Sequence, residues 1–230
     1  MKTEIKLLLQ TISSNADIRL KEIAEQNWNE EWEKTIQPIE IGERLVIKPS
    51  WAAYENKAGR IIIHIDPKMS FGTGYHETTR LTLQLLERYI TPRCTLFDAG
   101  TGTGVLAIAG IKLGASAAVG VDIDEWSIIN AQENVLANEV SENIEISDTP
   151  VERFTVKQFD IITANLTLNT NSELLPQFVR LLAPKGTLLL SGLLVTDRTA
   201  MRAKLQEDHF DVIEELTEHE WIAIAAKARL

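Results

Sequence analysis

From about residue 95 onward, short apolar runs alternate with longer segments whose apolar residues recur at helical spacing. Continuous apolar runs such as 159–164 are typical of strands buried on both faces of a sheet. The pattern predicts strands over 95–97, 117–124, 143–146, 159–164 and 187–190, and helices over 79–89, 105–112, 125–138, 173–182 and 197–206. Alternation of this kind implies a parallel sheet with helices on both faces.

The last part of the chain departs from this alternation. Apolar runs at 212–216 and 221–226 follow one another with only a short polar turn between them, which suits an antiparallel hairpin. The predicted fold class is therefore α/β: a doubly wound, mostly parallel sheet of seven strands that ends in a C-terminal antiparallel hairpin.

The N-terminal part has a different pattern of polar and apolar residues. Residues 1–38 are polar with helical spacing, Trp28 and Trp32 lie on one helix face, and Pro38 ends the stretch. We interpret the two tryptophans as anchors onto the main domain, with a docking face for a partner as the alternative. Short strands are expected over 39–65. We expect two domains: a short N-terminal helical segment and linker over 1–50, and a cofactor-binding domain over 51–230.

The strongest chemical signal is the segment Asp98–Gly104, with the sequence DAGTGTG, between a predicted strand and a predicted helix. Gly100, Gly102 and Gly104 allow a sharp turn with positive φ and leave no side chain between the backbone and a ligand. The loop also ends at a helix N-terminus, where free N–H groups favour negative charge. Asp98 can accept hydrogen bonds from the loop amides or from a cationic ligand. We therefore expect these four residues to bind a nucleotide-like cofactor.

The spacing of the glycines indicates which cofactor. A dinucleotide fingerprint needs Gly or Ala at the position that Val105 occupies, so a nicotinamide dehydrogenase is disfavoured. Gly-x-Gly-x-Gly is instead the pattern of S-adenosylmethionine (SAM) methyltransferases. Asp122 follows the next strand, where an acidic side chain typically holds ribose hydroxyls. Asp148 follows the strand after that, at the same predicted edge of the sheet, and joins the predicted cofactor-binding residues.

Asn165 ends the strand predicted over 159–164 and is the candidate catalytic residue. In methyltransferases that act on nitrogen, an Asn at this position accepts a hydrogen bond from the target amine and aims its lone pair. Pro-Pro often follows that Asn, but Leu166-Thr167 stands here, which disfavours a planar base amine as the target.

A second loop, DPKMSFGTGYHETT over 66–79, precedes the first strand of the predicted sheet. Thr78 and Thr79 are plausible helix-start residues that can present hydroxyls to a ligand. We interpret His76 as a hydrogen-bonding strut in the loop rather than as a base.

Composition limits the partners. A net charge of −10 argues against binding to a phosphate backbone, so no direct nucleic-acid binding is expected, whereas a basic protein would be attracted. The single cysteine, Cys94, excludes an internal disulfide and a cysteine-cluster metal site, and we expect it to be a packing residue and no metal to be bound. Neither a membrane span nor a signal peptide is apparent, which predicts a cytoplasmic protein with no membrane partner.

With both loops in view, the sequence resembles the ribosomal protein L11 methyltransferases, a bacterial family that methylates protein amino groups. The similarity covers roughly 28–230, and its most specific part is the FGTG-x-H-x-TT loop. The matching stretches are DPKMSFGTGYHETT (66–79), DAGTGTG (98–104), VGVDID (119–124), ANL (164–166) and LLSGL (189–193). The family usually has a larger N-terminal recognition domain than the 27 residues before Trp28, so the resemblance implies a shortened one.

The resemblance implies that Thr79, Gly100, Asp122 and Asn165 contact SAM. It implies transfer of a methyl group to lysine or α-amino groups of a protein, and the acceptor that the family name indicates is a basic ribosomal protein. Two alternatives stay open: N-methylation of another protein or of a small molecule, and SAM binding without catalysis.

Overall fold

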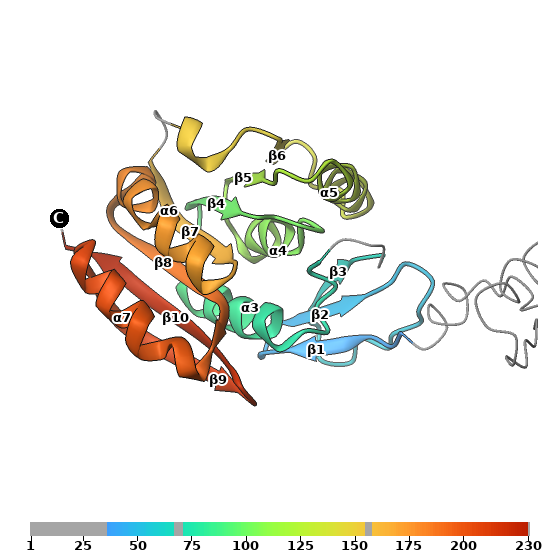
Figure 1. Cartoon of the computed structure of the whole chain (residues 1–230). Helices are drawn as coiled ribbons and strands as arrows, with labels where there is room; N and C mark the ends of the chain where they lie inside the picture. Colours follow the sequence, from blue (N-terminus) through green and yellow to red (C-terminus); the bar gives the residue numbers. More distant parts are fainter. Residues whose placement is uncertain (1–35, 67–70, 155–157, 230) are drawn as a thin grey trace, which may run out of the picture. The chain divides into compact units, whose positions relative to one another are not determined.

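A computed structural model describes residues 36–66, 71–154 and 158–229 (Figure 1). In that part of the chain, no helix is long and apolar enough to cross a membrane. Trp28 and Trp32 lie outside the described residues, so their predicted roles stay predictions.

A seven-stranded sheet has the order β6-β5-β4-β7-β8-β10-β9 (Figure 1). Its first five strands are parallel, and β10 runs antiparallel to both β8 and β9. The strands are β4 (Thr95–Ala99), β5 (Ala117–Val121), β6 (Ile144–Ser147), β7 (Phe159–Asn165), β8 (Leu182–Leu194), β9 (Phe210–Glu218) and β10 (Trp221–Ala228). The predicted fold class, including the C-terminal hairpin, is confirmed.

Helices cover both faces of this sheet because successive strand residues point to opposite sides. Leu96 belongs to the core on one face, with residues of α3 (Glu77–Tyr89), α4 (Val105–Leu113) and α5 (Glu125–Ala137). Its neighbour Phe97 belongs to the core on the other face, with residues of α6 (Leu168–Leu181) and α7 (Arg198–Glu207). Short 3-10 helices lie at Val151–Arg153 (η1) and Val195–Asp197 (η2). Cys94 is buried in the first core, as its interpretation as a packing residue requires.

A second sheet of three strands, β1 (Ile39–Ile41), β2 (Leu45–Lys48) and β3 (Ile61–His64), packs on the α3 side. Residues 36–230 cluster as one compact unit, which therefore includes the strands at 39–48 that the sequence assigned to the linker. The division into a segment 1–50 and a domain 51–230 stays a prediction, since 1–35 lie outside the described residues.

Several element boundaries differ from the sequence prediction, and the largest differences are at the starts of α6 and β8. The helix predicted over 173–182 begins earlier, at Leu168, because the Thr167 hydroxyl accepts from the amide of Thr170 and caps it. The strand predicted over 187–190 begins earlier, at Leu182, and β8 continues across Pro184-Lys185-Gly186, which break its regular pairing. The register of β7 with β8 shifts there, so the break is an irregularity within a strand.

Candidate cofactor and acceptor site

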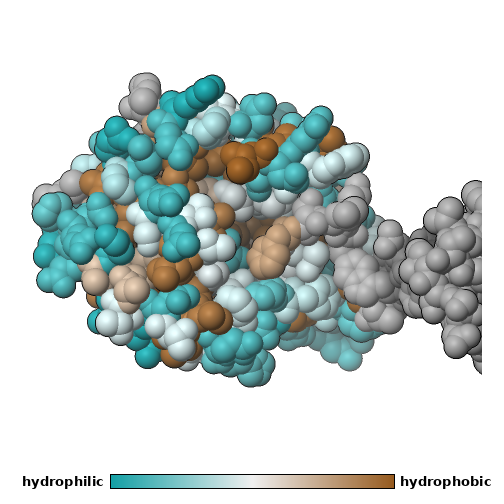
Figure 2. All heavy atoms as spheres, in the orientation of Figure 1, coloured by the Kyte–Doolittle hydropathy of each residue, from teal (hydrophilic) through white to brown (hydrophobic). Residues whose placement is uncertain are grey.

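A cavity of about 540 Å³ lies at the carboxyl ends of the parallel strands, next to β4 and β7. These two strands are neighbours in the sheet but not consecutive in the chain, so the strand order reverses between them, and ligands bind at such a point in α/β sheets. Figure 2 shows apolar residues around a hollow in the face drawn. Gly100 and Gly102 line the cavity after β4, Asp122 and Ile123 after β5, and Asn165 and Leu166 at the end of β7. Its volume lies within the range of small-molecule sites, about 300–1,000 Å³.

Asp98 organises the glycine loop from inside the protein. Its side chain is fully buried, and its two carboxylate oxygens accept hydrogen bonds from the hydroxyls of Thr101 and Thr163, each at 2.7 Å. Gly100, Gly102 and Gly104 all have positive φ, as the sequence predicted for a sharp turn. The amides of Gly100 and Thr101 both donate to the carbonyl of Val121 at 2.9 Å, which ties the loop to β5.

Burial raises the pKa of Asp98 to about 6, above its ordinary value of 3.8. Because the folded-state pKa is the higher one, the stability that Asp98 contributes is fully present below about pH 4 and is lost as pH rises through about 6. The change amounts to about 3 kcal/mol in the free energy of unfolding. We expect Asp98→Asn to remove this pH dependence. Chemical denaturation of both proteins between pH 4 and 7 measures it, and a constant difference between their unfolding free energies would contradict the assignment.

Asp122 lies where a ribose-binding carboxylate is expected. One of its oxygens accepts from the amide of Gly102 at 2.9 Å, and the other accepts from the amide of Asp124 at 3.1 Å. Each carboxylate oxygen has further acceptor capacity, and Asp122 lines the cavity. The side chain is therefore held in one orientation and can still accept from ligand hydroxyls.

The loop before α3 is fastened to the glycine loop. The amide of Thr103 donates to the carbonyl of Phe71 at 3.0 Å, and its hydroxyl donates to the carbonyl of Gly72 at 2.7 Å. A Cβ at Gly102 would lie under 3.0 Å from the Phe71 carbonyl oxygen, so only glycine permits this approach. Phe71 lines the cavity, as a lid over the ligand would.

Asn165 lines the cavity and has an unused side-chain acceptor. Its side-chain nitrogen donates to the hydroxyl of Thr79 at 3.4 Å, and its side-chain oxygen, Oδ1, takes no part in this hydrogen bond. That oxygen is buried and has no hydrogen-bond partner among the described residues. An unpaired buried acceptor is costly unless a ligand completes it, so this atom marks where a donor on a ligand would bind.

Aromatic rings close the side of the cavity next to Asn165. The His76 ring centroid lies 4.8 Å from that of Trp221, edge to face, and 5.3 Å from that of Phe71, and all three residues line the cavity. His76 caps α3, and its Nδ1 contacts the Thr78 hydroxyl at 2.8 Å. The helix therefore starts at Glu77 rather than at the threonines, and His76 acts as the strut that the sequence predicted.

The structure separates the predicted site residues into two groups. Gly100, Gly102, Asp122 and Asn165 line the cavity. The others do not belong to its wall: Thr79 supports Asn165, Asp98 holds the loop, Gly104 caps α4, and Asp148 is exposed beside Thr149, which does line the cavity. A direct contact of these four with SAM stays a prediction.

Several cavity residues were not found from the sequence. They include Trp221, Gly192 and Glu173, whereas Thr78, which also lines the wall, was one of the two threonines expected to present a hydroxyl to a ligand. The glycine of LLSGL was the one available signal, since it follows an apolar strand. Trp221 gave no signal because it is brought to the site only by pairing of β10 with β8.

SAM fits the residues present. The cavity combines a carboxylate for ribose hydroxyls with apolar residues beside it for a purine, among them Ile123, Val151 and Leu174. Asn165, whose buried Oδ1 has no hydrogen-bond partner among the described residues, lines the cavity after β7. Side-chain-free glycines also line the cavity.

The strand order, the glycine loop and this cavity together define a class I SAM-dependent methyltransferase. A family model described as ribosomal protein L11 methyltransferase (PrmA) matches residues 2–229. The chain belongs to that family.

Individual relatives agree. The ribosomal protein L11 methyltransferase of Caldanaerobacter subterraneus subsp. tengcongensis is 37% identical over 215 residues, which are 94% of this chain and 69% of that protein. The crystal structure of ribosomal protein L11 methylase from Lactobacillus delbrueckii subsp. bulgaricus has a TM-score of 0.79 at 30% identity, covering 84% of this chain and 100% of that one. A Burkholderia thailandensis N1-methyltransferase with bound S-adenosylhomocysteine shares the fold at 16% identity, with a TM-score of 0.56 over 67% of this chain and 79% of that one.

Proposed function

We propose that this protein transfers methyl groups from SAM to amines of ribosomal protein L11, on lysine side chains or the α-amino group. The observation that carries the proposal is that Asn165, a cavity-lining residue, has a buried Oδ1 with no hydrogen-bond partner among the described residues. An amine donates an N–H to such an acceptor, and its lone pair then points away from it along a fixed direction. The family relatives that are named for this substrate support the same acceptor.

The residues of the chain position SAM and the acceptor amine and exclude water from the site. SAM, when bound, supplies an activated methyl group on a sulfonium. We propose that Asp122 and Ile123 hold its nucleoside end and that the glycine loop, with Phe71 above it, holds the rest. Asn165 then orients the acceptor, which is the main requirement for an in-line displacement.

A lysine acceptor must lose a proton before it reacts. Its reference pKa is about 10.4, so less than about 1% of it is neutral at pH 7. Burial among the aromatic rings beside Asn165 disfavours the charged form and lowers that pKa. No dedicated strong base is then required, and His76, engaged with Thr78, is not assigned that role.

We propose further that the protein acceptor is basic and that nucleic acid is not bound directly. The net charge of −10 attracts a basic protein over distances of about 10 Å and repels a phosphate backbone. A ribosomal protein is synthesised in the cytoplasm, so the proposed substrate also favours a cytoplasmic location.

The test is transfer of labelled methyl from SAM to ribosomal proteins of cells that lack the enzyme. We expect one labelled band, at L11, and none with Asn165→Ala. SAM binding measured on the same preparation separates an inactive sample from a wrong substrate. Confirmed SAM binding with no labelled protein, or with label on a different protein or a small molecule, would overturn the proposal.

A further inference from the structure

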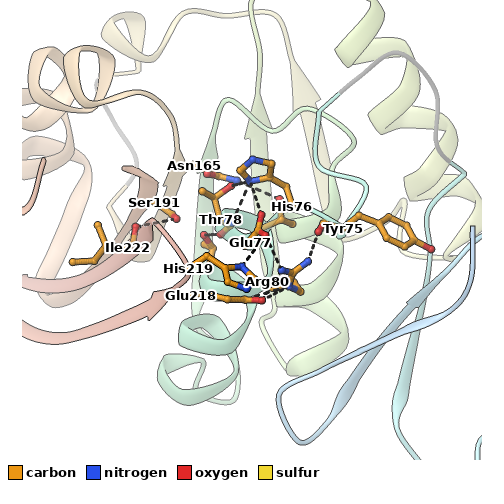
Figure 3. A network of polar contacts seen from close by, with 12 residues as sticks. Tyr75, His76, Glu77, Thr78, Arg80, Asn165, Ser191, Glu218, His219 and Ile222 are labelled. Atoms are coloured by element: carbon orange, nitrogen blue, oxygen red, sulfur yellow. Dashed lines mark hydrogen bonds and ion pairs between the residues drawn. The ribbon is translucent and has the colours of Figure 1, made fainter. Parts of the chain in front are cut away.

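A group of charged side chains joins the turn between β9 and β10 to the first turn of α3, outside the cavity (Figure 3). Arg80 of α3 donates from Nη2 and Nε to the carboxylate of Glu218, at 2.5 and 3.1 Å from Oε1. Glu77 of α3 pairs with Nδ1 of His219 at 3.2 Å. These partners are 138 and 142 residues apart in the chain, so each contact fixes a tertiary arrangement rather than a local turn.

The same group reaches the loop before α3. Arg80 also donates from Nη1 to the carbonyl of Tyr75, the residue before His76. Its side chain is only 17% exposed and Glu218 is 30% exposed, so the pair is partly shielded from water. An arginine that engages a carboxylate through two nitrogens holds its partner in a defined orientation, which a lysine would not do.

The residues next to these contacts belong to the cavity. His76 precedes Glu77, and Trp221 lies three residues after Glu218 and pairs with it across the hairpin. Their rings meet edge to face at 4.8 Å, and both line the cavity. Figure 3 shows His76 and Thr78 beside Asn165, with the charged group next to them.

We propose that Arg80, with Glu218 and Glu77, is a positioning device that holds His76 and Trp221 together at the acceptor end of the cavity. It sets the width of the space in which the amine meets Asn165 and does not touch SAM. The inference rests on the proposed function, because it assigns the His76–Trp221 wall to the acceptor. Arg80 is thus a positioning residue for methyl transfer.

The chain contains a matched control. Arg88 lies two turns further along α3 and pairs with Glu214, also of β9. Neither of these two residues lines the cavity. Arg88→Gln therefore removes an ion pair between the same two elements without affecting the aromatic wall.

The experiment compares the wild type, Arg80→Gln, Glu218→Gln, the double variant and Arg88→Gln in steady-state methylation of ribosomal protein L11. We expect Arg80→Gln to lower kcat/KM for the protein acceptor about tenfold or more, since a small misplacement at a reacting centre is costly. Its Kd for SAM should change less than about threefold. Glu218→Gln should reproduce the effect, and the double variant should be no worse than either single one, as expected for a shared contact. Arg80→Lys should restore only part of the activity.

Lost positioning and a general loss of stability are two explanations for a loss of activity in Arg80→Gln. Arg80→Gln should lower Tm somewhat more than Arg88→Gln, because the Arg80 side chain is 17% exposed and that of Arg88 is 49% exposed, so the SAM affinity is the readout that separates the two explanations. Equal kinetic constants for these two variants would overturn the proposal, and so would a loss of SAM affinity in Arg80→Gln as large as its loss of kcat/KM. If the wild type binds SAM but does not methylate L11, the proposed function fails and the acceptor role given to this wall fails with it.

Discussion

Replacing Asn165 with alanine is expected to lower kcat for methyl transfer by about a hundredfold or more. The substitution removes the one buried acceptor that the described structure leaves unpaired at the cavity wall. Loss of a single preoriented hydrogen-bonding group at a reacting centre typically costs about 10²–10³-fold in rate. The fold should persist, because the side chain makes one long hydrogen bond, at 3.4 Å to Thr79.

Labelled-methyl transfer under single-turnover conditions measures this effect, with the Kd for SAM measured in parallel. Asn169→Ala is the matched control, since Asn169 is an exposed Asn four residues further on, in the first turn of α6. We expect the control to transfer methyl at the wild-type rate. A rate for Asn165→Ala within about threefold of the wild type would remove Asn165 from the mechanism.

The second large effect is expected for Gly192→Ala, which should lower both stability and activity. Gly192 has φ +78°, and a Cβ there would lie under 3.0 Å from the carbonyl oxygen, carbon and amide nitrogen of Leu166. Backbone atoms cannot rotate away as a side chain can. Leu166 follows Asn165 directly, so the shift that relieves the clash also displaces Asn165, the residue that we propose orients the acceptor amine. We expect a loss of about 3 kcal/mol in unfolding free energy and about a hundredfold in rate.

Gly59→Ala isolates the part of this effect that comes from backbone conformation alone. Gly59 has a similar φ of +64°, but a Cβ there would meet nothing within 4 Å. Its replacement should cost about 1 kcal/mol and leave methyl transfer unchanged. Denaturant unfolding and transfer rates of the two variants give the comparison. Equal losses of stability would mean that the approach of Leu166 to Gly192 does not restrict this position.

Much of the fold was predictable from the sequence because its signals are local. The apolar runs and helical spacings specify elements whose own periodicity decides which face is buried, and the seven-stranded sheet followed from their order. The loop 98–104 was predictable for the same reason. Each of its glycines has the positive φ that the motif indicates, which is a property of the backbone at that position.

The two largest boundary errors have different physical causes. Pro184-Lys185-Gly186 does form a break, and Lys185 has φ +67°, but β8 pairs with β7 on both sides of it, at Leu182 and at Thr187, so the strand extends across it. Leu168 starts α6 although Pro176 stands inside that helix. The Thr167 side chain caps α6 at this point, which is a local signal that the sequence prediction missed.

The sequence by itself determined the class of cofactor and the residues that follow each strand, because a strand end and a glycine turn are properties of short segments. Only the tertiary structure decided which residues form the end of the cavity that we propose for the methyl acceptor. It brought Trp221 against His76 and Gly192 against Leu166, and left Oδ1 of Asn165 without a partner among the described residues. The reason is physical: these pairs are far apart in the chain, and no local periodicity records which strands will pair.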